Sequence, residues 1–208
     1  MIELYFASTP NAQRALIALE EAGLPYTLRP LDLLKGEQRF NSFLELNPLG
    51  AVPVLVDSDG PEGRRLVLTQ SIGIILYVAE RSRSLIPLDA GRRIDMFKWM
   101  MLAASDVAGT NTTINQLRRS APDKSEANLR FFEERLLAYF ASSDEQLRAF
   151  DYLASEFSLA DISLYPFAIA RRALIEQGGL TGLLAWMARM TERRAVAKAM
   201  SVSTMRNP

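Results

Sequence analysis

The sequence contains no cysteine and no histidine among its 208 residues. Without cysteine the chain can form neither a disulfide bond nor a thiolate metal site, and it has no cysteine nucleophile. Without histidine it lacks the side chain that most often serves as a general base near neutral pH. Any chemistry must therefore use hydroxyl, amide or carboxylate groups, or a reagent that a ligand brings, and we expect no metal cofactor.

The sequence also lacks an excess of charge of either sign, since 24 Lys and Arg residues balance 24 Asp and Glu residues. This balance offers no general attraction to nucleic acid or to an anionic membrane. The most apolar helical stretch, around 96–108, contains Lys98 and Asp106 and is too short to cross a bilayer. Because a strand-like segment follows Met1 at once, we expect no basic and apolar leader. We therefore expect a cytoplasmic protein that binds neither nucleic acid nor membrane.

An apolar run at 51–57 predicts a buried strand that is entered through Pro53. Proline donates no backbone hydrogen bond, so it suits the first position of such a strand. If the Val52-Pro53 bond is cis, the backbone N–H and C=O of Val52 face outward and can pair with an extended peptide. A small peptide ligand is the first functional hypothesis.

The first eighty residues predict an alternation of strands and helices. A strand at 2–6, a helix at 12–22 that stops at Gly23 and a strand at 26–31 form a βαβ unit with parallel strands. The pattern continues with a short helix near 38–46, a hairpin of strands 54–56 and 66–69, and a helix over 71–81 that Ser71 caps. The order is βαβαββα.

The apolar rhythm breaks between residues 83 and 89, and no further strand is predicted. We therefore expect two domains, one at 1–82 and a helical one at 89–208, with residues from Ser201 onward frayed at the end. The predicted helices of the second domain span 90–118, 124–140, 159–176, 180–190 and 193–200. A hydroxyl at Ser158, three residues before the Asp161 carboxylate, predicts a capping box at the start of the third of these helices.

This order of elements, with Val52-Pro53, Gln70-Ser71 and the Ser158-to-Asp161 box at their spacings, resembles the glutathione transferase family over nearly the whole chain. The resemblance implies an α/β thioredoxin-like N-terminal domain followed by an all-α C-terminal domain. The segments 5–11 and 19–23 are most similar to the bacterial nu class, whose members resemble glutathione-dependent disulfide-bond reductases. Glutathione would be the co-substrate, a small electrophile or disulfide the second substrate, and a homodimer the assembly.

The resemblance also implies which residues hold glutathione. Val52, next to Pro53, would bind its cysteinyl part through two backbone hydrogen bonds, and Gln38 would meet its glycyl carboxylate. Gln70 and Ser71 lie where a strand becomes a helix, and the open N–H groups of a helix start favour a carboxylate such as the γ-glutamyl one. The alternative for Ser71 is a plain helix cap.

The ligand sulfur would then point at the start of the first helix, where the nu-class pattern implies Thr9 and Asn11 as donors to a thiolate. Hydroxyl and amide donors near a helix N-terminus favour charged sulfur. Both residues would otherwise merely close the turn before the helix. Ser8 is a rival donor if the turn is rotated by one residue, and Tyr5 matches the phenol of the tyrosine-type classes.

Further candidates and one contrasting function remain open. Lys35 and Arg39 follow the second strand and are alternatives to Gln38, or simply solvated. Asp106 and Arg130 would reach a glutathione site across a dimer, or else lie on a helix surface. The contrasting function is an interaction module of the same fold that has no catalytic turnover.

Overall fold

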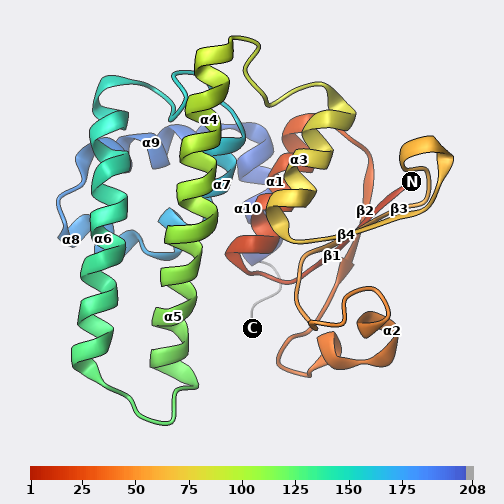
Figure 1. Ribbon diagram of the computed structural model, residues 1–208, viewed down its shortest axis with the longest axis horizontal. Coiled ribbons are helices and arrows are strands. Elements are labelled where there is room, and N and C mark those ends of the chain that lie inside the picture. Colours follow the sequence, from red (N-terminus) through yellow and green to blue (C-terminus); the bar gives the residue numbers. More distant parts are fainter. Residues whose placement is uncertain (205–208) are drawn as a thin grey trace. The chain divides into compact units, whose positions relative to one another are not determined.

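The computed structural model describes residues 1–204, with side chains to residue 202, and the chain divides into two compact units. The α/β unit contains Met1–Leu85 together with the chain from Arg193 onward, and the helical unit contains Ile86–Glu192 (Figure 1). Contacts within each unit define this division, and they do not show whether either unit folds on its own. The domain boundaries at residues 82 and 89 therefore stay a prediction.

The α/β unit is built on a mixed four-stranded sheet in the order β2-β1-β3-β4. Its strands are β1 (Ile2–Phe6), β2 (Tyr26–Pro30), β3 (Val54–Asp57) and β4 (Leu66–Thr69). β1 pairs with β2 in parallel, while β3 is antiparallel to both β1 and β4. The predicted βαβ unit and the hairpin are confirmed, and the sheet is that of a thioredoxin-like domain.

Helices cover both faces of this sheet. The unit contains α1 (Pro10–Ala22), α2 (Asn41–Leu44), α3 (Ser71–Ser82) and α10 (Arg194–Thr204), with 3₁₀ turns at Glu37–Arg39 and Pro61–Gly63. α1 and α3 pack against each other on one face, and α2 lies on the other (Figure 1). α1 ends at Gly23 as predicted, since its φ of 64° is a conformation that glycine adopts without steric cost. The segment expected to fray from Ser201 is helical as far as Thr204, so the expectation is wrong there, and residues 205–208 lie outside the described residues.

Alternation along the strands sends side chains into two cores. Leu4, Phe6 and Leu55 are buried on the α1 and α3 side. Tyr5 projects to the opposite face, where its ring centroid lies 5.9 Å from that of Phe43 in α2. The sheet is therefore fixed on both faces at the end where β1 leads into α1.

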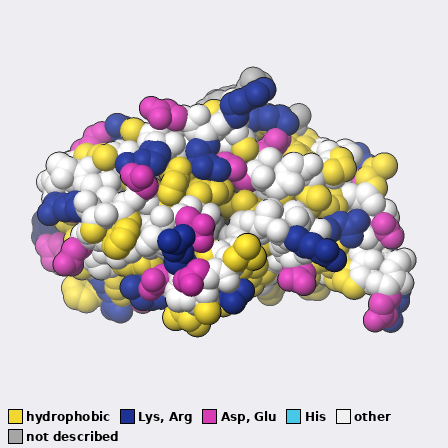
Figure 2. Space-filling model, turned by 90° about the horizontal axis from the view of Figure 1, so that it is seen from above, with side chains coloured by type: hydrophobic (Ala, Val, Ile, Leu, Met, Phe, Trp, Pro, Cys, Tyr) yellow, Lys and Arg dark blue, Asp and Glu magenta, His cyan; other side chains and the backbone are white. Residues whose placement is uncertain are grey.

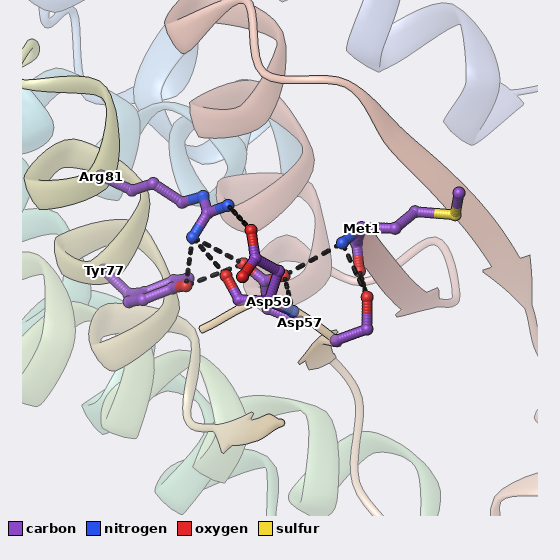
Figure 3. Close-up of polar contacts among 6 residues, drawn as sticks. Met1, Asp57, Asp59, Tyr77 and Arg81 are labelled. Atoms are coloured by element: carbon purple, nitrogen blue, oxygen red, sulfur yellow. Dashed lines mark hydrogen bonds and ion pairs between the residues drawn. The ribbon is translucent and has the colours of Figure 1, made fainter. Parts of the chain in front are cut away.

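A buried aspartate at the end of β3 ties the strand to α3 and to the first residue of the chain (Figure 3). The Tyr77 hydroxyl donates to Asp57 Oδ2 at 2.8 Å, Arg81 Nη1 lies 3.2 Å from the same oxygen, and the Met1 ammonium lies 3.3 Å from Oδ1. Burial alone would raise the pKa of Asp57, but the Asp59 N–H, the Tyr77 hydroxyl and these cations bring it below its usual value. These contacts fix the position of the end of β3 relative to α3.

The helical unit contains only helices and turns among its described residues. They are α4 (Ala90–Leu102), α5 (Ala108–Arg119), α6 (Glu126–Ala149), α7 (Leu159–Ala170), α8 (Arg172–Gln177) and α9 (Thr181–Glu192). The single helix predicted over 90–118 is interrupted by a π-helical turn at Ala103–Val107. The Ser105 hydroxyl donates to the Met101 carbonyl at 2.8 Å, a side-chain bond of the kind that disturbs the helical ladder.

Helix α6 continues to Ala149, past its predicted end at Phe140. Packing against α9 explains the extension: Asp144 is buried and its Oδ1 accepts the Leu183 N–H at 2.9 Å. A Cβ at Gly182 would lie 2.8 Å from the Asp144 carbonyl, so only glycine lets the two helices approach this closely. Tertiary contacts therefore set this helix end.

The predicted capping box is confirmed, because Ser158 and Asp161 bond each other's backbone N–H groups at the start of α7. Asp161 does more than cap, since its Oδ1 also accepts from Trp186 Nε1 at 2.9 Å and from the Leu153 N–H at 3.1 Å. Burial raises the pKa of Asp161 to about 6, and these hydrogen bonds oppose the rise. The carboxylate is a buried hub of the helical unit.

The surface carries charge of both signs. Figure 2 shows Lys and Arg side chains interspersed with Asp and Glu side chains across the face in view. No helix among residues 1–204 has the length and apolar character needed to span a bilayer. This face therefore offers no extended field of one sign.

Candidate functional site

The predicted sulfur-contacting residues lie at the start of α1. Thr9 is the N-cap of this helix, and its Oγ1 accepts the Ala12 N–H at 3.3 Å. The cap uses the oxygen of the hydroxyl and leaves its hydrogen free to donate elsewhere. Pro10 at the first helical position has no N–H and a φ suited to a helix start. The turn reading of Thr9 is correct, and it is compatible with the donor role.

Asn11 and Ser71, far apart in the sequence, meet between α1 and α3. Ser71 Oγ donates to Asn11 Oδ1 at 3.3 Å, and Arg14 Nη1 donates to Asn11 Oδ1 at 3.2 Å and to Ser71 Oγ at 3.3 Å. Because the Asn11 oxygen faces Arg14 and Ser71, its amide nitrogen is directed elsewhere. No residue in the described part of the chain accepts a hydrogen bond from that nitrogen, which leaves two N–H donors available.

Arg14 is the functional residue that the sequence reasoning missed. It lies one helical turn after Asn11, and only 1% of its surface is exposed. Burial lowers the pKa of its guanidinium to about 9. Its place inside the apolar face of α1, between Asn11 and Leu16, is the one signal in the sequence, since an arginine there must find polar partners.

Ser71 is the first residue of α3 and not its cap, because the N-cap position belongs to Gln70. Gln70 is exposed and has φ 68° and ψ 113°, a backbone conformation that a non-glycine residue rarely adopts. No described side chain caps the helix, so the N–H groups of its first turn remain open. These groups, next to Arg14, suit a carboxylate.

The backbone of Val52 is available for a ligand strand. The Val52-Pro53 peptide bond is cis, and neither the N–H nor the C=O of Val52 bonds to any described residue. Asn47 holds the loop in front of it, donating from Nδ2 to the Ala51 carbonyl at 2.7 Å and accepting the Leu49 N–H at 3.2 Å. Asn47 is a second positioning residue that the sequence reasoning missed.

Gln38 lies in the 3₁₀ turn and contacts the same loop, since a Cβ at Gly50 would lie 3.1 Å from its carbonyl oxygen. Its Nε2 reaches the Leu33 carbonyl at 3.5 Å, and its Oε1 is buried without a hydrogen-bond partner. In this orientation the acceptor oxygen is buried, and the donor Nε2 faces the Leu33 carbonyl. A ligand carboxylate would have to compete with that carbonyl for the Nε2 hydrogens.

The rival residues of the α/β unit are placed less favourably. Tyr5 packs its ring on Phe43. Ser8 is half-buried immediately before Thr9, so it stays an alternative donor. Lys35 pairs with Asp32 at 3.3 Å, and Arg39 is exposed. Asn11 and Ser71, by contrast, both accept hydrogen bonds from the buried Arg14.

Asp106 and Arg130 belong to the helical unit. Asp106 lies in the π-helical turn, with its Oδ2 2.8 Å from the Ser105 hydroxyl oxygen, while Arg130 is exposed on α6. Within residues 1–204 no group of three or more acidic side chains could hold a metal ion.

Comparison with known proteins assigns the family. The family model described as glutathione S-transferase, N-terminal domain, matches residues 9–81. Glutathione S-transferase F10 of Arabidopsis thaliana is 30% identical over 176 residues, which cover 80% of this chain and 79% of that protein. The chain belongs to the glutathione transferase family. Among other members, the disulfide-bond oxidoreductase YfcG of Escherichia coli is 28% identical over 203 residues, covering 96% of this chain and 94% of that protein.

Solved structures of the glutathione transferase family share the fold. A family member from Pseudomonas fluorescens, with two glutathione bound, superposes with a TM-score of 0.87 at 24% identity and covers 96% of this chain and 92% of that one. A glutathione transferase from Pseudomonas putida, with one glutathione disulfide bound per subunit, gives 0.86 at 24% identity, with 97% and 91% covered. These likenesses confirm the predicted two-part fold.

Proposed function

We propose that this protein is a glutathione-dependent transferase or disulfide-bond reductase that activates the thiol of bound glutathione. The observation that carries the proposal is the joined start of α1 and α3, where Asn11, Arg14 and Ser71 share hydrogen bonds. This junction gathers open donors of three kinds: a hydroxyl, an amide and helix N–H groups. Such donors stabilise anions, and a glutathione thiolate carries both carboxylates and charged sulfur.

In this proposal each residue binds a defined part of glutathione. The open N–H groups of α3, with Gln70 and Ser71, hold the γ-glutamyl carboxylate. The unpaired N–H and C=O of Val52, fixed by Pro53, hold the cysteinyl part. Gln38 contacts the glycyl end. Thr9 Oγ1 and Asn11 Nδ2 donate to the sulfur.

The chemistry then follows from the thiolate. With an electrophilic carbon, a sulfur–carbon bond forms as the leaving group departs with its electron pair. With a disulfide, the thiolate attacks one sulfur and the other leaves as a thiolate that takes a proton from water. A second glutathione thiolate releases the remaining thiol, so two glutathione molecules are oxidised to their disulfide while the substrate is reduced. The chain has no cysteine, so this cycle involves no mixed disulfide with the protein.

We favour disulfide reduction over conjugation. Two relatives that this chain matches over nearly its whole length, YfcG and YghU of Escherichia coli, are named disulfide-bond oxidoreductases. Steady-state assays with a dialkyl disulfide and with an activated aryl chloride would separate the two reactions. Turnover of the disulfide with a rate that depends on two glutathione molecules is expected, and turnover of the aryl chloride alone would reverse the assignment.

Ultraviolet titration of the bound thiolate tests the activation step. A free thiol has a pKa of about 8.5. Lowering this pKa by about two units requires that the site stabilise the thiolate over the thiol by about 2.7 kcal/mol. We expect such a lowering in the wild type, a smaller one in Thr9→Ala and Asn11→Ala, and recovery in Thr9→Ser. Thr112→Ala, which removes an exposed hydroxyl bonded only to the Ala108 carbonyl, is the matched control.

Two results would overturn the proposal. One is a thiol pKa that binding leaves unshifted, or that both alanine variants leave as in the wild type. The other is no heat of glutathione binding at millimolar concentration by calorimetry, which would favour the interaction module without turnover.

A cytoplasmic homodimer is part of the same proposal. The helices α4 and α6 expose large apolar side chains, with 67% of Ile94, 45% of Met101 and 57% of Phe131 accessible. Apolar side chains of this size favour burial against a second copy. The cytoplasm keeps glutathione reduced, as the reaction requires. Light scattering and cell fractionation would test assembly and location; a monomeric mass at micromolar concentration would exclude the dimer.

A further inference from the structure

Arg171, between α7 and α8, is the buried arginine of the helical unit, with 9% of its surface exposed. Its Nε donates to Asn111 Oδ1 at 2.7 Å, and its Nη2 donates to Asn115 Oδ1 at 2.7 Å and to the Asn111 carbonyl at 3.5 Å. The two asparagines are one turn apart on α5 and hold the guanidinium in a fixed orientation. Three neutral oxygens of α5 thus fix the position of one cation.

The positive charge of Arg171 is not neutralised. All three acceptors are neutral oxygens, and no carboxylate of residues 1–202 forms an ion pair with it. The nearest acidic influence is Glu133, which is already paired with Arg118. Burial lowers the pKa of Arg171, and Arg118 and Arg119 lower it further. An anion arriving here would relieve the repulsion among these cations.

The three residues also leave hydrogen-bond donors open. Arg171 Nη1 has no partner in the described part of the chain, and it is not sealed from solvent. Asn111 and Asn115 each accept from Arg171 through Oδ1, and their Nδ2 groups likewise have no described partner. The open groups are all donors, with no acceptor among them.

We propose that Arg171, Asn111 and Asn115 form a binding site for the carboxylate of a small organic anion. Nη1 supplies the charge-assisted hydrogen bond, and an asparagine amide supplies a second donor to the other oxygen. A metal ion does not suit a set of open donors. The site consists of helical-unit residues alone, so it stands or falls independently of glutathione binding by the α/β unit.

Nuclear magnetic resonance titration of the full chain with succinate, at constant ionic strength, tests the site. We expect saturable shifts of the Asn111 and Asn115 side-chain amide signals and of the Arg171 Nε signal. Parallel titrations with inorganic phosphate identify the anion class. Weaker binding of phosphate supports a carboxylate site, whereas stronger binding of phosphate, or no saturable shift with succinate, overturns the proposal.

Two variants and a matched control complete the test. Arg171→Gln removes the cation, and Asn115→Asp places a carboxylate against it at an exposed position where folding is preserved. Each is expected to weaken succinate binding about tenfold or more, the loss expected for a charge-assisted hydrogen bond. Arg172→Gln, which changes the adjacent arginine paired with Glu176 at 2.7 Å, leaves binding unchanged. Undiminished binding in Asn115→Asp, or equal loss in the control, would rule the site out.

Discussion

Among residues 1–202, each unit of this protein buries one arginine, and the two are held in similar ways. Arg14 donates to the side-chain oxygens of Asn11 and Ser71, and Arg171 donates to those of Asn111 and Asn115. The difference lies in access. Arg14 is 1% exposed, whereas Arg171 is 9% exposed and its Nη1 has no partner among the described residues.

Because of this difference, we assign different roles to Arg14 and Arg171. An enclosed guanidinium has its hydrogen bonds directed at its neighbours, so its effect is to orient them: Asn11 turns its amide oxygen toward Arg14. A guanidinium with an unpartnered nitrogen keeps a donor for a ligand. Arg14 is therefore a positioning residue, and Arg171 a binding residue. The following substitutions would break or sharpen this distinction.

The largest effect is expected from Arg14→Leu. The substitution removes the Arg14 hydrogen bonds to Asn11 Oδ1 and Ser71 Oγ and leaves Ser71 Oγ without this donor, which we expect to cost about 3 kcal/mol of unfolding free energy. Urea unfolding measures it. Arg39→Leu, at an exposed arginine of the same unit, is the control and should change stability by less than about 0.5 kcal/mol. A loss below about 1 kcal/mol for Arg14→Leu would show that its hydrogen bonds do not organise the site.

The buried aspartates extend the comparison through pH. Burial raises the pKa of Asp161 to about 6, above its value of about 3.9 in the unfolded chain. The stability that the protonated carboxyl contributes is therefore fully present below the unfolded pKa and is lost as the pH rises through 6. The wild type should therefore gain on the order of 2–3 kcal/mol relative to Asp161→Asn between pH 7 and pH 4. Urea unfolding across this range gives the difference directly.

Asp57 provides the opposite sign as a control. Its pKa is lowered in the folded state, so its contribution is present above the unfolded value and is lost as pH falls through the folded one. Acidification should therefore reduce the difference in unfolding free energy between the wild type and Asp57→Asn. If both variants responded to pH with the same sign, the contrast between a desolvated and an ion-paired aspartate would be wrong.

A smaller gain is expected from Asn115→Asp. A carboxylate at this position would pair with Arg171, whose charge has no anionic partner within the described chain, and should raise the unfolding free energy by about 1 kcal/mol at pH 7. The gain should disappear below about pH 4 as the new carboxylate is protonated. Asn41→Asp, at an exposed asparagine of the α/β unit, is the control. A loss of stability in Asn115→Asp would mean that the Arg171 charge is already balanced.

Much of this architecture follows from local sequence signals. Gly23 ends α1, Pro53 opens β3, and Ser158 with Asp161 starts α7, because each is a residue whose backbone or side chain suits one position. The limits of prediction lie where tertiary contacts decide. The π-helical turn at Ala103–Val107 has no local signal in the sequence, and the extension of α6 accompanies its packing against α9.

The site was predictable only in part for the same reason. Thr9, Asn11 and Ser71 could be located from the family pattern, but a pattern does not show that one buried cation joins two of them. Arg14 and Arg171 both read as ordinary helix residues, since charge in a helix is usually solvated. The burial of each depends on partners more than fifty residues away, Ser71 for the first and Asn111 for the second.

The smallest effect is expected from Arg172→Gln, one position after the buried arginine. Arg172 is exposed and pairs with Glu176 one helical turn later, a contact that water and salt screen. Urea unfolding should change by less than about 0.5 kcal/mol. Adjacent arginines would then differ in stability effect because their environments differ, with equal formal charge. If Arg172→Gln lowered the unfolding free energy as much as Arg171→Gln, the effect would come from the local charge density of the segment. The distinction between buried and solvated guanidinium groups would then be wrong.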